Sequence, residues 1–342
     1  MEFAVESWAP EYGSALGDLA ADADQGELSP AAVSVRTDAE VPDARWAPRD
    51  PRAEAAQVVR FLDGVRRIDA RVWITDDAGQ VHQGLAASYA AGVVRCDGVA
   101  RVESCAVRRT LFSAAPSLSA VITRNGSYQP CSVNEPGAEQ LSLRLQRVMG
   151  DLERLMAVER LRAGDAQAHS GDGPHGGDGG LLVVDGPLSG VPLGAAGAAG
   201  GLPAAVGYVK THRRSYLPVE LTTVVAALMP GQRTPLFLTT TGWSRWSWYL
   251  QLPPGRATGD PSGAHAWAGV VRCEASGDLD VASAVALADC TAATLPRYAS
   301  APQKDARAPQ NLVPVGQLER HLRHALGDAR LLERALRLAA AA

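Results

Sequence analysis

The chain alternates between apolar runs broken by Gly and Asp, which predict strands, and stretches with apolar side chains at every third or fourth position, which predict helices. Four runs in the first part of the chain are typical of an antiparallel meander: 58–63, 68–74, 80–94 and 99–111. Residues 138–163 have the helical spacing and contain no proline. They predict the clearest helix of the chain.

The second half of the chain shows the same alternation in shorter elements. Strands are predicted, in chain order, at 181–184, 205–210, 234–241, 246–252 and 267–274. Residues 217–228 fit a helix or a loop, and amphipathic helices are predicted at 278–293 and at 318–338, the last with a break at Gly327-Asp328. The 342 residues suffice for about two domains, or for one large α/β domain with insertions.

Three segments lack a regular pattern. Residues 1–54 mix Pro, Asp and Ala, with a helical spacing only near 14–23, and we interpret them as a loosely packed N-terminal arm. A single domain would then extend over residues 55–342. Within it, the stretches near 164–180 and 190–203, rich in Gly and Ala, are interpreted as flexible insertions.

The composition limits which binding partners and which cellular compartment we expect for this protein. The net charge is −4, so contacts with nucleic acid must come from local basic clusters. The five cysteines include no C-x-x-C pair, which favours a reducing compartment over a disulfide framework or a zinc ribbon. The acidic N-terminal residues lack the apolar core of a secretory signal, and no run approaches the length of a membrane span. We therefore expect a cytoplasmic protein with no membrane partner.

Two apolar runs end in an aspartate followed by glycine, at Asp63-Gly64 and at Asp185-Gly186. A strand that leaves the core at a carboxylate places that carboxylate at the edge of the sheet, and the glycine leaves room for a ligand beside it. The two aspartates would be neighbours only if their strands lie side by side, which is the arrangement that a two-metal phosphodiester-cleaving site needs. The alternative is that each Asp-Gly pair is an ordinary turn.

A third carboxylate is expected from the long predicted helix. Glu153 lies one turn from Met149 and from Met156, at the margin of the apolar stripe, and Glu159 is its competitor. The alternative for both glutamates is a solvated side chain paired with a nearby arginine. Lys210, at the end of the strand after Asp185, is placed to offset the charge of a phosphate, although a surface lysine is equally consistent with its position.

No nucleotide or zinc motif accompanies these residues. The chain has no Walker A run, no G-x-G-x-x-G, no H-E-x-x-H and no G-x-S-x-G. This leaves carboxylate chemistry as the main hypothesis. Carboxylates are hard ligands, so they favour Mg²⁺ or Mn²⁺ over zinc.

In these motifs the chain resembles the NurA nuclease family, the partners of HerA-type DNA translocases. The resemblance covers roughly residues 55–340 and rests, in chain order, on Phe61-Leu62-Asp63-Gly64, Val184-Asp185-Gly186-Pro187-Leu188, Val206-Gly207-Tyr208-Val209-Lys210 and the loop 298–312. It implies a ribonuclease H-like α/β fold, with a mixed sheet flanked by helices and with C-terminal helices. It also implies a manganese-dependent DNA nuclease that acts on ends or single strands, forms a homodimer, and works with a HerA-like ATPase translocase in DNA end resection.

The resemblance also implies a set of site residues. Two aspartates and a glutamate would be the metal ligands, with a lysine nearby and with a tyrosine and a histidine from the C-terminal segment. The matching residues here are Asp63 and Asp185, Glu153 with Glu159 in reserve, Lys210, and Tyr298.

The expected histidine is missing. The loop after Tyr298 carries Gln303-Lys304-Asp305 where an imidazole is expected, and a glutamine takes up no proton near neutral pH. Either Asp305 substitutes as a ligand, or the chain is weakened or inactive as a nuclease. The alternative function is therefore a catalytically degenerate relative that serves as a docking or DNA-binding subunit.

Overall fold

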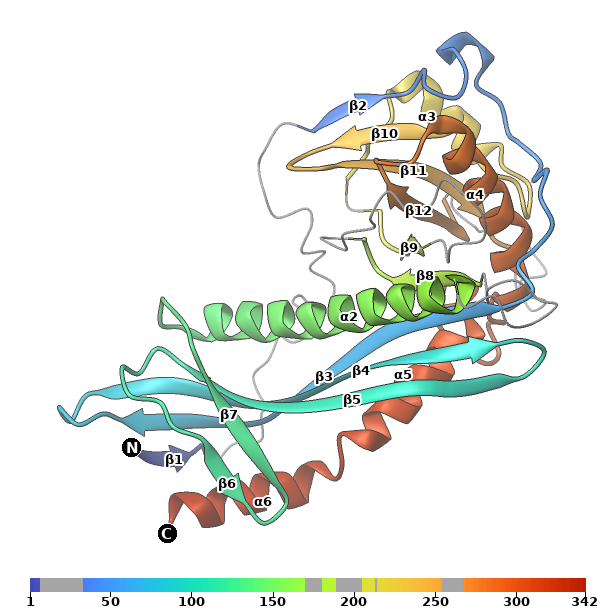
Figure 1. Ribbon diagram of the computed structural model, residues 1–342. Helices are drawn as coiled ribbons and strands as arrows, with labels where there is room; N and C mark the ends of the chain where they lie inside the picture. The colour runs from blue at the N-terminus through green and yellow to red at the C-terminus, as the bar shows by residue number, and fades with distance from the viewer. Residues whose placement is uncertain (7–32, 170–179, 189–204, 213, 254–266) are drawn as a thin grey trace.

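The computed structural model describes residues 1–6, 33–169, 180–188, 205–212, 214–253 and 267–342 (Figure 1). They form an α/β protein around one large mixed sheet of twelve strands. The strands are β1 (Glu2–Val5), β2 (Ser34–Arg36), β3 (Val59–Thr75), β4 (Val81–Cys96), β5 (Ala100–Ser113), β6 (Val121–Thr123), β7 (Gly126–Ser132), β8 (Leu181–Asp185), β9 (Ala205–Val209), β10 (Phe237–Thr240), β11 (Ser244–Gln251) and β12 (Val270–Ser276).

The order of the strands joins two groups that are far apart in sequence. It runs β2-β10-β11-β12-β9-β8-β3-β4-β5-β7-β6, and β1 pairs separately with β3. The central pairs β3·β8 and β8·β9 are parallel, as is β5·β7, and the other pairs are antiparallel. Strand β3 is therefore the junction between the N-terminal meander and the strands of the second half.

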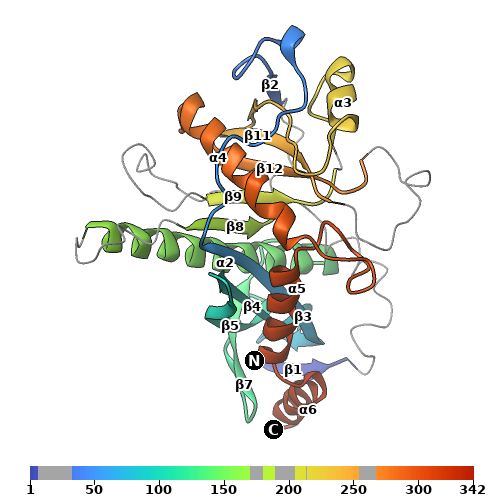
Figure 2. The ribbon, with the colours of Figure 1, turned by 90° about the vertical axis from the view of Figure 1, so that its right-hand side faces the viewer.

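Helices cover both faces of this sheet. They are α2 (Ala138–His169), α3 (Val219–Ala226), α4 (Val281–Thr294), α5 (Val313–Ala325) and α6 (Ala329–Ala340), with the short 3-10 helices η1 (Asp43–Arg45) and η4 (Leu295–Tyr298). Leu62 of β3 packs with α2 on one face, whereas Phe61 packs with α4 and α5 on the other. Figure 2 shows α4 and α5 together in front of the strands. Since successive strand residues point to opposite faces, this alternation decides which helix each β3 side chain meets.

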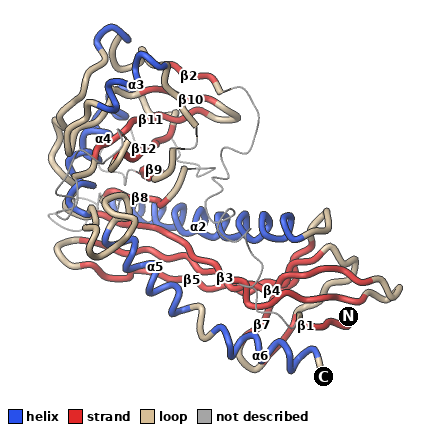
Figure 3. Tube along the Cα trace, turned by 180° about the vertical axis from the view of Figure 1, so that it is seen from behind, coloured by secondary structure: helices blue, strands red, loops and turns tan. Residues whose placement is uncertain are grey.

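The far end of the meander carries the ends of the chain. Helix α6 packs through Leu336 on the distal halves of β3, β4 and β5, and both termini lie at this end (Figure 3). Among the described residues, no helix has the length and apolar character needed to cross a membrane.

Most predicted elements are present, with three differences. The two predicted strands around 58–74 are one continuous strand of 17 residues, because β4 pairs with it along its whole length. The predicted helix at 138–163 continues to His169, so the start of the expected insertion at 164–180 is helical. Residues 170 to 179 of that insertion, and the whole of the one at 190–203, lie outside the described residues.

The third difference concerns residues 1–54. The described parts of this segment are not a loose arm, because β1 pairs with β3 and β2 pairs with β10. Trp46 is buried and donates a hydrogen bond to the carbonyl of Thr37. These backbone pairings could not be read from a segment with so little alternation of apolar and polar residues.

A buried ionic cluster lies within the second group of strands. Glu274 of β12 forms an ion pair with Arg245 of β11, at 3.4 Å, and another with Arg272, at 3.0 Å. All three side chains are almost completely buried. The Arg245 guanidinium also lies over the Trp243 ring, and that of Arg272 over the Tyr216 ring. One buried carboxylate is thus paired with two buried cations.

Candidate metal centre

Parallel pairing of β3 with β8 brings the two predicted aspartates together. Leu62 is paired with Val184, so Asp63 and Asp185 are the next residues on adjacent strands. Phe61 and Val183, two positions earlier, both pack in the hydrophobic core on the α5 side. Because side chains alternate along a strand, both carboxylates point to that same face.

The two Asp-Gly pairs have different backbones. Asp185 ends β8 and Gly186 turns the chain with φ +117°, as a turn predicts. Asp63-Gly64 instead lies inside β3, which continues to Thr75. The interpretation of Asp63-Gly64 as a turn is therefore wrong, and its glycine has another role, described below.

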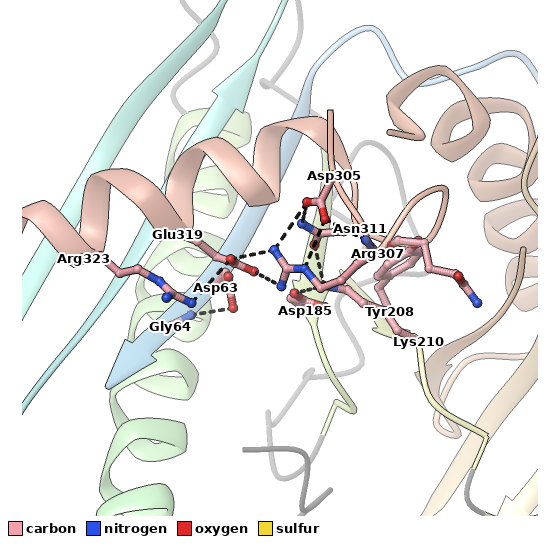
Figure 4. Close-up of polar contacts among 11 residues, drawn as sticks. Asp63, Gly64, Asp185, Tyr208, Lys210, Asp305, Arg307, Asn311, Glu319 and Arg323 are labelled. Atoms are coloured by element: carbon pink, nitrogen blue, oxygen red, sulfur yellow. Dashed lines mark hydrogen bonds and ion pairs between the residues drawn. The ribbon is translucent and has the colours of Figure 1, made fainter. Parts of the chain in front are cut away.

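Glu319 on α5 completes a cluster of three carboxylates (Figure 4). Asp63, Asp185 and Glu319 each offer an oxygen within 4.8 Å of the others. Helix α5 can lie this close because Gly92, paired with Asp63, has no side chain: a Cβ there would lie 3.0 Å from Leu322. A close helix places Glu319 beside Asp63 and Asp185.

Two cations are paired with this cluster. The Lys210 ammonium lies 2.5 Å from Asp185 Oδ2 and 3.0 Å from Asn311 Oδ1. The Arg307 guanidinium donates to both oxygens of Glu319, at 3.0 Å from Nη1 to Oε1 and 2.9 Å from Nη2 to Oε2. Two of the three carboxylates are therefore already paired with side chains of the protein.

The loop between η4 and α5 lies against the centre and contributes polar side chains to it. The Tyr208 hydroxyl donates to the carbonyl of Gln310 at 2.7 Å, and the adjacent Asn311 is fully buried. Asn311 also donates to Asp305 Oδ2 at 2.5 Å, and Arg307 contacts the same carboxylate at 3.4 Å. The loop is thus fastened to β9 and carries a polar network that reaches the carboxylates.

Burial and neighbouring charges shift the pKa values of the ionisable groups in the centre. Burial, and then the charge of Asp185, raise the pKa of Asp63 well above its usual range, against the opposing effect of Lys210. Burial alone would lower the pKa of Lys210, but Asp185 and Asp63 outweigh it and raise that pKa. If all three carboxylates were ionised, the centre would hold more negative charge than its two cations neutralise, which adds to the effect of burial in favouring the protonated form of Asp63.

Glu153 approaches from the other face of the sheet. It belongs to α2, and a Cβ on Gly64 would collide with its carboxylate. Gly64 therefore makes the space in which Glu153 lies beside β3. Burial, followed by the charge of Asp185, raises the pKa of Glu153 to about 8, although its side chain keeps some contact with solvent.

The remaining predicted residues lie at different distances from the centre. Glu159 is exposed on α2 and is not part of the cluster. Tyr298 packs edge-on against Phe61, with ring centroids 4.9 Å apart, so it is a neighbour of the β3 strand in the core rather than of the carboxylates. Gln303 is exposed, and Asp305 reaches the cluster only through Asn311 and Arg307.

Three residues of the centre were missed from sequence: Glu319, Arg307 and Asn311. Glu319 did carry a signal, because Val315 and Leu322 lie four residues before it and three after it on the apolar side of its helix. The same marginal position had singled out Glu153. Arg307 and Asn311 lie in an irregular loop, where no periodicity indicates which side chains face the site.

The donors fit a hard divalent cation. Carboxylate oxygens suit Mg²⁺ or Mn²⁺, and a cation among them would offset the negative charge of Asp185 that helps to raise the pKa of Asp63. The residues that could hold it are Asp63, Asp185 and Glu319, with Glu153 adjacent on the opposite face. Such a centre, flanked by a lysine and an arginine, can neutralise a bound phosphate.

Comparisons with known proteins were made for the whole chain. No protein-family model matches it, and no curated protein matches it either. The resemblance to the NurA nucleases therefore stays a hypothesis, and the chemistry of the centre has to support it.

Proposed function

We propose that this chain is a divalent-metal-dependent DNA nuclease of the NurA type, with a ribonuclease H-like arrangement of its sheet. The observation that carries the proposal is a cluster of three carboxylates: Asp63 and Asp185 on adjacent parallel strands, and Glu319 on α5, with Lys210 beside them. Metal-dependent phosphodiester hydrolysis uses carboxylates that hold the metal ions beside the scissile phosphate.

Each residue has a role that follows from its position. Asp63, Asp185 and Glu319 would hold Mn²⁺ or Mg²⁺, which when bound supplies charge neutralisation for a scissile phosphate and a more acidic water. Lys210 is anchored by Asp185 and Asn311, so its ammonium stays at the edge of the cluster and can pair with a phosphate oxygen. Glu153, with a pKa of about 8, can carry a proton at neutral pH.

The wider context belongs to the same proposal. Single-stranded DNA or DNA ends would be the substrate, and a homodimer would act in the cytoplasm with a HerA-like translocase in end resection. The chain is acidic overall, so its contacts with DNA must be local.

A second candidate function is a non-catalytic docking or DNA-binding subunit. It is favoured by the pairing of Arg307 with both oxygens of Glu319 and of Lys210 with Asp185. These pairs stabilise the carboxylates without a metal. The exposed Gln303 in place of the expected histidine supports the same alternative.

Cleavage assays decide between these functions. Labelled single-stranded and double-stranded DNA would be incubated with the protein and Mn²⁺, Mg²⁺ or EDTA, beside the variants Asp185→Asn and Asp151→Asn. Asp151 is exposed on α2 and serves as the matched control. We expect metal-dependent cleavage that is lost in Asp185→Asn and kept in Asp151→Asn.

The two functions also differ in metal binding. A cluster that binds Mn²⁺ only in the folded state raises the thermal midpoint as the metal concentration rises. No cleavage, with a folded protein and no such shift at millimolar Mn²⁺, would refute the nuclease and favour the docking subunit. Cleavage by a folded Asp185→Asn variant at the wild-type rate would also refute the assignment of the centre.

A further inference from the structure

Arg307 contacts the same carboxylate oxygens that a metal ion at this centre would use. Its guanidinium donates to Oε1 and to Oε2 of Glu319, so each oxygen already accepts a hydrogen bond from a positive charge, which repels a second cation on the same oxygen. Whichever oxygen Glu319 gives to the cluster with Asp63 and Asp185 is one that Arg307 already holds. A divalent cation at this centre therefore competes with the guanidinium for Glu319.

The two cations of the centre differ in how easily they can leave. The Lys210 side chain is about one-fifth exposed and is held by Asp185 and by the buried Asn311. The Arg307 side chain is 54% exposed and comes from the loop above the centre. Exposed ion pairs are weak because water solvates the separated charges. Arg307 is thus the cation that a metal can displace.

A displaced Arg307 would stay close to the centre. Its own backbone lies in the loop that Tyr208 and Asn311 fasten to the sheet, and Asp305, two residues earlier, contacts the guanidinium at 3.4 Å. A guanidinium offers a planar pair of donors that matches two phosphate oxygens as well as it matches a carboxylate. The same donors can therefore serve Glu319 without metal and a phosphate with metal.

We propose that Arg307 is an exchangeable counter-ion, which a divalent cation displaces from Glu319 and which then binds a phosphate group of the substrate. The metal exchange concerns the carboxylate centre alone, whereas the phosphate contact rests on the proposed nuclease function. Metal binding and substrate binding are coupled in this scheme, because occupation of the centre releases the donor that recognises the substrate.

The first test measures Mn²⁺ affinity by titration calorimetry on the intact protein, without DNA. Arg307→Gln removes the competing guanidinium, and we expect its Kd for Mn²⁺ to fall about tenfold. Arg323→Gln is the matched control, since Arg323 lies 3.8 Å from the same carboxylate but is 69% exposed and lacks the paired hydrogen bonds. We expect the control to change the Kd by less than about twofold.

The variant Arg307→Lys separates the effect of the positive charge from that of the two parallel hydrogen bonds. A lysine keeps the charge but cannot donate in parallel to both oxygens, so its Mn²⁺ affinity should lie between those of the wild type and Arg307→Gln. Unchanged or weaker Mn²⁺ binding by Arg307→Gln, with a native circular dichroism spectrum, would overturn the exchange. An equal gain in Arg323→Gln would overturn it too, because the effect would then be one of general charge.

The second test measures the phosphate contact. A fluorescent single-stranded oligonucleotide is titrated with protein in Ca²⁺, and binding is followed by anisotropy. We expect Arg307→Gln to bind it several-fold more weakly than wild type and Arg323→Gln do, and equal binding by all three would overturn this half of the proposal.

The outcomes distinguish this inference from the nuclease proposal. If Arg307→Gln binds Mn²⁺ more tightly and the wild-type protein cleaves no DNA, the exchange is supported and the nuclease is refuted. Metal-dependent cleavage by the wild type, with no change in Mn²⁺ affinity in Arg307→Gln, refutes the exchange and leaves the nuclease standing.

Discussion

The raised pKa of Glu153 makes a prediction about stability against pH. This carboxyl has a pKa of about 8 in the fold, caused first by burial and then by Asp185, against 4.5 for an ordinary glutamate. Between these two values the folded protein keeps the proton and the unfolded chain releases it. The free energy of unfolding must therefore fall as the pH rises through this interval, and Glu153→Gln should remove the part of the fall that Glu153 causes.

The size of the effect follows from the two pKa values. At about 1.4 kcal/mol for each pKa unit, the difference sets an upper limit of about 5 kcal/mol. The Glu153 side chain is partly exposed, and solvent screening reduces the effect, so we expect about 2 kcal/mol. Asp63 adds a dependence of the same sign, because its pKa is raised as well and Glu153 is one of the causes.

Urea denaturation between pH 5 and pH 8, with EDTA present, measures this difference. Glu153→Gln should gain stability relative to wild type as the pH rises, and Glu159→Gln, on the exposed side of the same helix, should follow the wild type. Parallel curves for wild type and Glu153→Gln would refute the reasoning. They would mean that the carboxylate is solvated and that its neighbours do not perturb it.

Two further predictions concern side chains around the sheet. Gly64→Ala puts a methyl group where the Glu153 carboxylate lies, and that carboxylate can move because it ends a flexible side chain. We therefore expect the free energy of unfolding in urea to fall by less than about 1 kcal/mol. Its pH dependence should resemble that of Glu153→Gln. A larger loss at all pH values would show that the backbone, rather than Glu153, had moved. Glu274→Gln removes the carboxylate charge that pairs with two buried arginines and should cost about 3 to 5 kcal/mol, whereas a cost under about 1 kcal/mol would contradict the buried ion pairs.

The strands and the two aspartates could be predicted because local chemistry specifies them. Apolar runs that stop at Asp-Gly gave the position of Asp185 at a strand end. The sequence predicted adjacent strands for Asp63 and Asp185 only as a condition for metal chemistry, and it did not predict that they are parallel, because pairing between distant segments depends on the whole sheet. The long helix was predicted from its spacing alone, since 3.6-residue periodicity is a local property.

The third carboxylate shows where sequence reasoning stopped. Glu153 and Glu319 both lie beside the apolar stripe of a helix, and the difference between them is set by which face of β3 each helix covers. That choice depends on Gly92 and Gly64, which let a helix or a side chain approach the sheet closely. Glycines inside a strand look the same in sequence whether they serve packing or a turn.

The continuity of β3 has a consequence for how the protein unfolds. This strand of 17 residues pairs with β4 from its first to its last residue, with one register shift at Asp69, and with β8 over its first four positions. The meander and the second group of strands cannot come apart without breaking the hydrogen bonds of one shared strand. We therefore expect a single cooperative transition in which the backbone amides around Asp63, at the middle of the sheet, are among the last to exchange with solvent.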